Sequence, residues 1–191
     1  MIGKSFAAGF LIGLSCVMYL SVEPKAVAGL LFSMGLLSIC TLKLNLFTGL
    51  VGWYKRGTGE VLSAVLLWNI VGAAACAFLA GFTNPDLIDL SRNVISVKLA
   101  QTPLSSFIRA FFCGVLMYLA VVITKKTGNV IAILIAVPFF LLAGFEHSIA
   151  DAFYFYLAAD LSFLPRLALI ILGNATGSIT IHQLTKEEKK A

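Results

Sequence analysis

The chain contains 191 residues, of which 60% are hydrophobic and 12% are charged, and its formal net charge is +5. Its mean hydropathy of +0.98 is too high for a protein whose whole surface faces water. These values exclude a soluble globular domain and indicate an integral membrane protein. We assign no nucleic-acid partner to the positive charge, because the cations lie near the ends of the apolar segments.

Six apolar segments, each predicted to be a membrane span, follow one another along the chain. They cover residues 5–22, 26–54, 61–82, 104–124, 130–157 and 167–181, and polar residues interrupt the second and the fifth. The first segment is interpreted as a helix and not as a signal peptide. Lys4 is the only basic residue before it, and no processing site follows it.

The cations predict how these spans are oriented. One side of a six-span arrangement receives Lys4, Lys55, Arg56, Lys125, Lys126, Lys186, Lys189 and Lys190. The other side receives Lys25, Arg92, Lys98 and Arg166, which are diluted by acidic residues. The positive-inside rule makes the first side cytoplasmic, so we expect both termini to lie in the cytoplasm.

The interruptions put polar side chains where a bilayer tolerates them least. They cover residues 40–47 and 144–151, and the polar side chains in or beside them are Thr41, Lys43, Asn45, Thr48, Glu146, His147, Ser148 and Asp151. A charged side chain at the bilayer centre costs about 2.5–3.5 kcal/mol on insertion scales. Irregular backbone at that depth persists only in protein or beside a cavity. The pattern predicts a transport site where two broken helices meet, with free N–H groups at the helix ends attracting anions.

The chain also looks duplicated. Ser5-Phe6, Phe10, Gly13 and Tyr19 resemble Ser106-Phe107, Phe111, Gly114 and Tyr118, and both the third and the sixth segment contain Asn-x-x-Gly, at Asn69 and Asn174. A repeat of three spans must cross the membrane in opposite directions in its two copies. We therefore predict one channel domain over residues 1–191, an all-α membrane protein of six helices. It comprises two inverted three-helix repeats, at about 4–82 and 104–184, with broken second and fifth helices and a basic tail at 185–191.

Other interpretations of these residues were weighed. The cysteines Cys16, Cys40, Cys76 and Cys113 lie in apolar segments without metal-ligand spacing and are read as packing residues. An intramembrane metal carrier or hydrolase could use Glu146, His147, Ser148 and Asp151. Two ligands on one helical face are too few for a metal, and Ser148 is adjacent to the histidine it would need. Arg109 either reaches the membrane surface or stabilises a break.

Two motifs resemble the formate/nitrite transporter family, and the resemblance covers nearly the whole chain. Asn45-Leu46-Phe47-Thr48-Gly49 resembles the family's loop in the second span, and residues 144–150, Gly-Phe-Glu-His-Ser-Ile-Ala, resemble its signature in the fifth. Residues 32–36, residues 109–121 and the pair Gly173-Asn174 match as well.

The resemblance implies an aquaporin-like protomer with its own pore, assembled into a homopentamer in the inner membrane of a prokaryote. It implies a channel and not an enzyme, for formate, nitrite or hydrosulfide, with protons as co-substrates and no cofactor or metal. The implied constriction residues are Phe32, Leu36 and Leu46 on one side, and Phe140 and Met117 on the other. The implied polar residues are Thr48 and His147 between them, Lys98 as the external anion attractant, and Glu146 behind the histidine.

The sequence also departs from the family pattern. Asn45 stands where many members have an acid, and Asp151 stands where they have asparagine, so we hypothesise that Asn45 and Asp151 form an exchanged acid–amide pair. Gly114 stands where members of the family with formate activity commonly have asparagine. Among the three anions we expect formate first, then nitrite and then hydrosulfide. His147 either donates a proton to the substrate or stays neutral and shares a hydrogen bond with Thr48. Some members of the family use an N-terminal helix as a pH-dependent plug. This chain begins almost at the first span, so we also expect weaker gating by acid.

Overall fold

The computed structural model describes residues 1–186. Most of the expected basic tail, at 187–191, therefore lies outside the described residues. The described part is helical. Its elements are α1 (Ile2–Ser21), α2 (Lys25–Thr41), α3 (Phe47–Leu50), the 3-10 turn η1 (Val51–Trp53), α4 (Gly59–Thr83), α5 (Asp86–Leu99), α6 (Pro103–Thr127), α7 (Ile131–Leu142), α8 (Ser148–Ala158), the 3-10 turn η2 (Leu161–Phe163) and α9 (Leu164–Thr185).

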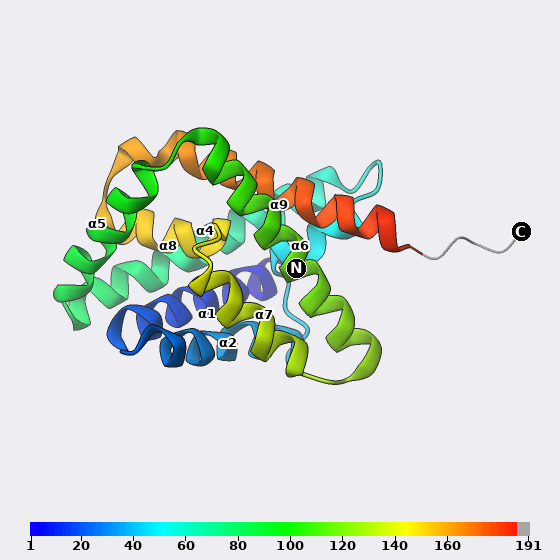
Figure 1. Ribbon diagram of the computed structural model, residues 1–191, viewed down its shortest axis with the longest axis horizontal. Coiled ribbons are helices and arrows are strands. Elements are labelled where there is room, and N and C mark those ends of the chain that lie inside the picture. Colours follow the sequence, from blue (N-terminus) through cyan, green and yellow to red (C-terminus); the bar gives the residue numbers. More distant parts are fainter. Residues whose placement is uncertain (187–191) are drawn as a thin grey trace, which may run out of the picture.

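Within residues 1–186, four helices are long and apolar enough to cross a membrane without interruption: α1, α4, α6 and, with η2, the segment Leu161–Thr185. The other two apolar segments are divided into half-helices. One consists of α2 and α3, and the other of α7 and α8. The six expected segments are therefore present, four continuous and two broken, and the chain has the all-α membrane fold that its sequence predicts (Figure 1).

The long helices pack as two close pairs, α1 with α4 and α6 with α9. Glycine permits this closeness, because a Cβ at Gly9 would overlap the backbone of Asn69 and one at Gly114 would overlap the backbone of Asn174. Gly9 and Gly114 therefore play corresponding parts. The sequence pattern instead matched Gly114 with Gly13, which lies four residues, or about one helical turn, after Gly9.

Each broken helix ends in the same way. Helix α2 stops before Lys43, which has a φ of 52°, and α7 stops before Gly144, which has a φ of 67°. A residue in this left-handed region ends a helix, because its backbone can no longer continue the ladder of hydrogen bonds. The chain then runs extended to Leu46 or His147, after which the next half-helix begins.

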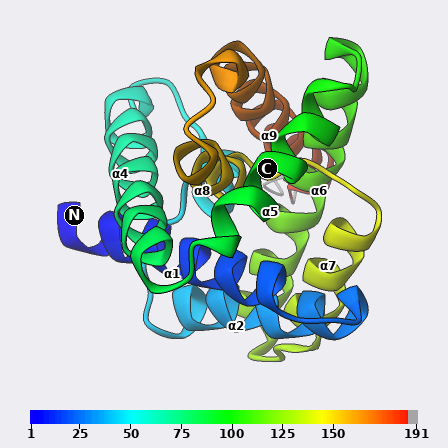
Figure 2. The same ribbon diagram turned by 90° about the vertical axis from the view of Figure 1, so that its left-hand side faces the viewer.

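Helix α5 was not expected from the apolar segments. It joins α4 to α6, and it buries one stripe of side chains, Leu87, Ser91 and Ile95, spaced four residues apart. It packs against α8. The half-helix α8 lies among α1, α4, α5 and α9, deep in the molecule (Figure 2). The elements that carry His147, Asp151 and Lys98 therefore meet at the centre.

Candidate functional site

The first break is held by the side chain of Asn69 on α4. Its Oδ1 accepts a hydrogen bond of 2.7 Å from the backbone N–H of Phe47, the first residue of α3. Its Nδ2 donates to the carbonyl oxygens of Asn45, at 2.8 Å, and of Ser5, at 2.7 Å. One buried amide thus ties the break to α1 and α4.

The second break is held in the same manner by Asn174 on α9. Its Oδ1 accepts a bond of 2.8 Å from the N–H of Ser148, the first residue of α8. Its Nδ2 donates to the carbonyl oxygens of Glu146 and Ala110, both at 2.8 Å. The shared Asn-x-x-Gly pattern therefore marks two equivalent anchors, a role that the sequence pattern alone did not reveal.

These anchors correct one expectation about the ends of the half-helices. Asn69 occupies the first N–H of α3, and Asn174 occupies the first N–H of α8. The ring of His147 accepts a further bond at the start of α8, from the N–H of Ala150. Because side chains of the protein already accept these bonds, the three N–H groups are not free to bind an anion.

His147 and Thr48, one from each break, form the central polar pair. Nε2 of His147 lies 3.0 Å from Oγ1 of Thr48, and Nδ1 accepts from the N–H of Ala150 at 3.2 Å. A backbone N–H can only donate, so Nδ1 carries no proton in this arrangement. The neutral ring therefore has its proton on Nε2 and donates it to Thr48. Both side chains are buried.

Apolar side chains lie on either side of this pair. The ring of Phe140 is centred 5.8 Å from that of His147, and Phe32 packs edge-on against Phe140 at 5.9 Å. Leu36 and Leu46 instead line a cavity of about 570 Å³. The structure therefore corrects the expected grouping, because Phe32 belongs with Phe140 and not with the two leucines. Met117 is buried on α6.

The cavity lined by Leu36 and Leu46 lies next to the residue Thr48, because Gly49 also lines it. Lys43 and Lys125 line it, together with Asn45 and Gly49, the residue after Thr48. Lys125 also lies over the ring of Trp53, 4.7 Å from its centroid. This cavity therefore combines two cations with apolar side chains, among them Leu36 and Leu46.

Lys98 lies on α5 in the company of two acids. Its Nζ is paired with Oε2 of Glu146, and with Oδ1 of Asp151 at 2.8 Å. Burial alone would lower the pKa of Lys98, but Asp151 and Glu146 raise it above its ordinary value, so the ammonium stays charged. The expected role as an external anion attractant is not supported by this geometry, because the charge of Lys98 is already compensated.

The hypothesised pair of Asn45 and Asp151 is wrong. Asp151 is paired with Lys98, whereas Asn45 lines the cavity together with Lys43 and Lys125. Among the described residues no hydrogen bond joins Asn45 to Asp151. Each break is anchored to its own half of the molecule, the first by Asn69 and the second by Asn174.

Three further polar residues complete the surroundings. Gln101 donates from Nε2 to Oε1 of Glu146 at 3.0 Å, and Arg166 donates to the carbonyl of Gln101 at 2.8 Å. Neither was singled out in the sequence as part of the site. Arg109 donates to the carbonyl of Gly144 at 2.9 Å, so of the two roles considered for it, the structure favours stabilising the break.

The arrangement speaks against hydrolysis by Ser148. The imidazole of His147 is bonded to Thr48 through one nitrogen and to the N–H of Ala150 through the other. Neither nitrogen can therefore accept the proton of the Ser148 hydroxyl, as a nucleophilic serine requires. Asp151, the other candidate ligand, is paired with Lys98.

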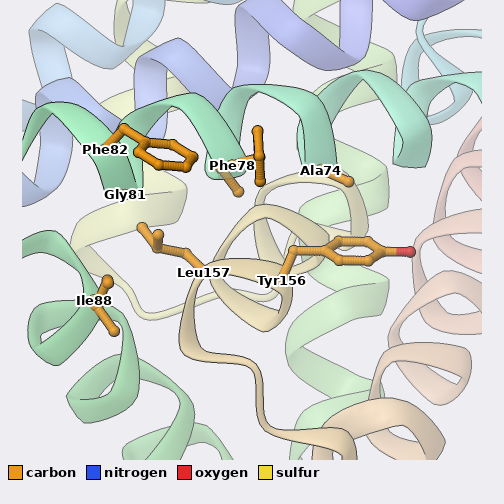
Figure 3. Close-up of a pocket in the computed structure, with 8 residues that line it drawn as sticks. Ala74, Phe78, Gly81, Phe82, Ile88, Tyr156 and Leu157 are labelled. Carbon is orange, nitrogen blue, oxygen red and sulfur yellow. The ribbon is translucent and has the colours of Figure 1, made fainter. Parts of the chain in front are cut away.

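A second hollow, on the outside of α4 and α8, has a different character. It is lined by Ala74, Ala77, Phe78, Gly81, Phe82, Ile88, Tyr156 and Leu157. Figure 3 shows the hydroxyl of Tyr156 pointing away from the other labelled side chains. The groove offers apolar surface and no charged group, so it does not suit a small anion.

Comparisons with known proteins agree with this geometry. Residues 1–186 match the family model described as formate/nitrite transporter. The fold is similar to that of a pentameric formate channel with formate bound, with 23% identity, a TM-score of 0.82 and coverage of 95% of this chain and 92% of that chain. It is also similar to an FNT family ion channel, with 22% identity, a TM-score of 0.84 and coverage of 96% and 87%. No curated protein matches the sequence.

Proposed function

Because the chain belongs to the formate/nitrite transporter family, a family of anion channels and not of enzymes, we propose that it passes formate through a pore in each protomer. The observation that carries this proposal is the buried hydrogen bond between His147 and Thr48, flanked by apolar side chains. A bare anion loses its hydration in such a place at a high cost, whereas a neutral acid loses much less. The permeating species is therefore the acid, or the anion together with a proton.

His147 acts as a hydrogen-bonding group in this proposal. Protonating its Nδ1 would turn an acceptor into a donor that faces the N–H of Ala150, which also donates. That arrangement opposes a positively charged ring. The neutral ring and the hydroxyl of Thr48 together offer polar contacts that a small acid can use in place of water.

The cavity lined by Lys43 and Lys125 supplies the anion on one side. Two cations at a mouth with apolar walls raise the local concentration of a small anion. Leu36 and Leu46 then exclude water, and Phe32 with Phe140 does so beyond His147. Since His147 and Thr48 are buried, these side chains must move for a molecule to pass.

Nitrite and hydrosulfide are the alternatives within the same family. Both are small and monovalent, and both have neutral forms that suit the same pair of polar groups. Gly114 does not distinguish among the three anions, because it packs against the backbone of Asn174.

The assembly and the orientation are part of the proposal. The pentamer of the similar formate channel supports a homopentamer here. At one end of the molecule, Lys125 packs on Trp53, and Trp53 lies beside His182, near the end of α9. The backbone of Lys4, at the start of α1, is bonded to Asn45, which lines the same cavity as Lys125. Both ends of the described chain thus lie near these cations, which supports cytoplasmic termini in the inner membrane of a prokaryote.

The proposal is tested with purified protein in liposomes. Flux of formate, nitrite, hydrosulfide, acetate and lactate is measured at several pH values for the wild type and for His147→Ala. We expect formate to pass faster than acetate and lactate, and the variant to lose most of this flux. Native mass spectrometry of the same sample tests the pentamer. Equal flux through protein-free liposomes and wild-type liposomes for all five solutes would overturn the proposal.

A further inference from the structure

Two acids and one base share a buried place behind His147. Nζ of Lys98 lies between Oε2 of Glu146 and Oδ1 of Asp151. The side chains of Glu146 and Asp151 are 1% and 2% exposed, and that of Lys98 is 14% exposed. If both acids were ionised, this cluster would carry one negative charge in excess.

No other charged group balances that excess among the described neighbours. The groups that face Asp151 are Lys98 from α5 and Glu146 from the break, with Cys16 from α1, Cys113 from α6 and Tyr154 from α8. The last three are neutral at physiological pH. Arg166 donates from its NH1 to the carbonyls of Lys98 and Gln101 and to the hydroxyl of Ser106. That nitrogen therefore binds neutral oxygens and neither carboxylate.

The hydrogen bonds indicate which acid keeps a proton. Both oxygens of Glu146 accept bonds, one from Lys98 and the other from Gln101, as an ionised carboxylate does. Asp151 accepts from Lys98 through Oδ1, but its Oδ2 has no partner among the described residues. A buried carboxylate oxygen without a donor is costly, whereas a protonated one is not charged.

The neighbours of Oδ2 along α8 suit a proton at that position. Ser148 and Tyr154 lie three residues before and three residues after Asp151, which places their side chains near it on the helix. The hydroxyl oxygens of both are buried and lack a protein partner among the described residues. The start of α8 favours an ionised acid through its dipole, but this effect is smaller than the cost of a buried unpaired charge.

We infer that Asp151 is a proton-binding site whose carboxyl group is protonated while Lys98 and Glu146 form an ion pair. Loss of that proton leaves a negative charge one helical turn from His147, because the N–H of Asp151 bonds to the carbonyl of His147 at 2.8 Å. Such a charge repels a permeating anion. The effect on permeation rests on the proposed channel function, whereas the protonation of Asp151 is inferred without it.

The proton is detected by infrared spectroscopy of the purified protein, with and without aspartate labelled by ¹³C at the side-chain carboxyl. We expect a carboxylic-acid band at neutral pH that shifts with the label and is absent from Asp151→Asn. Glu146→Gln should also lose the band, because one acid and one base then remain. Asp89→Asn, a change at an exposed acid on α5, should keep it. A wild type without the band, or a band that survives in Asp151→Asn, overturns the proton site.

Its effect on permeation is measured in liposomes. Formate flux, corrected for the fraction of formic acid, should fall as the pH rises through the value at which the band disappears. Asp151→Asn should show no such fall over that range. If the band titrates while the corrected flux stays constant, the effect on permeation is overturned. If the wild type carries no formate at all, the proposed function fails while the spectrum still reports on the proton.

Discussion

Nε2 of His147 lies 3.0 Å from Oγ1 of Thr48, although 99 residues separate them in the chain. Because Nδ1 accepts from the N–H of Ala150, the proton between the two side chains belongs to the ring. Thr48 therefore receives this bond and keeps its own hydroxyl proton for another acceptor. In the proposed channel that acceptor is the permeating molecule, which meets one donor from a threonine and the edge of a neutral imidazole.

Replacing Thr48 with valine tests this relationship, because valine keeps the shape and removes the oxygen. The N–H of the buried imidazole then lacks its acceptor, and the permeating acid loses a donor. A lost buried hydrogen bond costs about 1–3 kcal/mol, so we expect formate flux in liposomes to fall about 5-fold to 150-fold. Thr176→Val is the matched control, since the hydroxyl of Thr176 bonds only to carbonyls of its own helix. Equal flux in the two variants would contradict a role for the hydroxyl of Thr48.

Asn69 and Asn174 hold the two breaks in the same way, so we expect their replacement to destabilise the protein equally. Each makes three hydrogen bonds, one with the first N–H of a half-helix and two to carbonyl oxygens. At about 1 kcal/mol for each bond, Asn69→Ala and Asn174→Ala should each destabilise the protein by about 3 kcal/mol. Thermal unfolding in detergent measures both.

Similar losses in the two variants would support the proposed inverted repeats, at residues 4–82 and 104–184. Asn129→Ala serves as the control, because Asn129 is exposed and its side chain accepts only a local bond from the N–H of Ile131. A large loss in one variant and none in the other would show that the two halves are not anchored equivalently.

The two breaks could be predicted from the sequence, because polar residues inside an apolar segment are costly in a bilayer and are visible without knowledge of distant contacts. The six spans follow from apolar length in the same way. The pairing of Thr48 with His147 came from the family resemblance, since nothing local relates two residues 99 apart. Helix α5 was not predicted, because the sequence prediction rests on apolar spans. Only Leu87, Ser91 and Ile95 are buried on this helix, and its other positions are largely polar or exposed.

The partners of Lys98 could not be predicted for a different reason. The sequence places Lys98 between two spans, where a lysine is normally exposed. Helix α5 instead packs on α8, so the end of α5 delivers the ammonium to Glu146 and Asp151. This contact depends on how two distant elements pack, and the sequence pattern carries no signal of it. The same reason explains the error in pairing Asn45 with Asp151.

The floor formed by Leu36 and Leu46 predicts a change in size selectivity. Leu46 is buried at the end of the cavity, directly before the short helix α3 that carries Thr48. Leu46→Ala removes side-chain volume there, so we expect acetate and lactate flux to rise relative to formate flux. Leu42→Ala is the control, since Leu42 lies in the same break but is 61% exposed. An unchanged ratio of acetate to formate in Leu46→Ala would argue against a constriction at this residue.

Lys43 and Lys125 predict a dependence on salt. If the two cations concentrate anions at the mouth, their effect acts through the surrounding solution and is screened over a distance of about 10 Å at 0.1 M ionic strength. The double variant Lys43→Gln/Lys125→Gln should therefore lower formate flux several-fold at low ionic strength and have little effect in high salt. The measurement is initial flux in liposomes over a series of concentrations of an impermeant salt.

Lys25→Gln is the matched control for this double variant. Lys25 is also a lysine near the end of a helix, but it pairs with Glu23 and bonds to the carbonyl of Tyr19, and it does not line the cavity. Its replacement should leave both the flux and the salt dependence unchanged. If the double variant lowers flux equally at all salt concentrations, the lysines act by shaping the mouth and not by their charge, because packing is not screened by ions. If Lys25→Gln shows the same salt dependence as the double variant, the effect arises from net charge and not from the cavity.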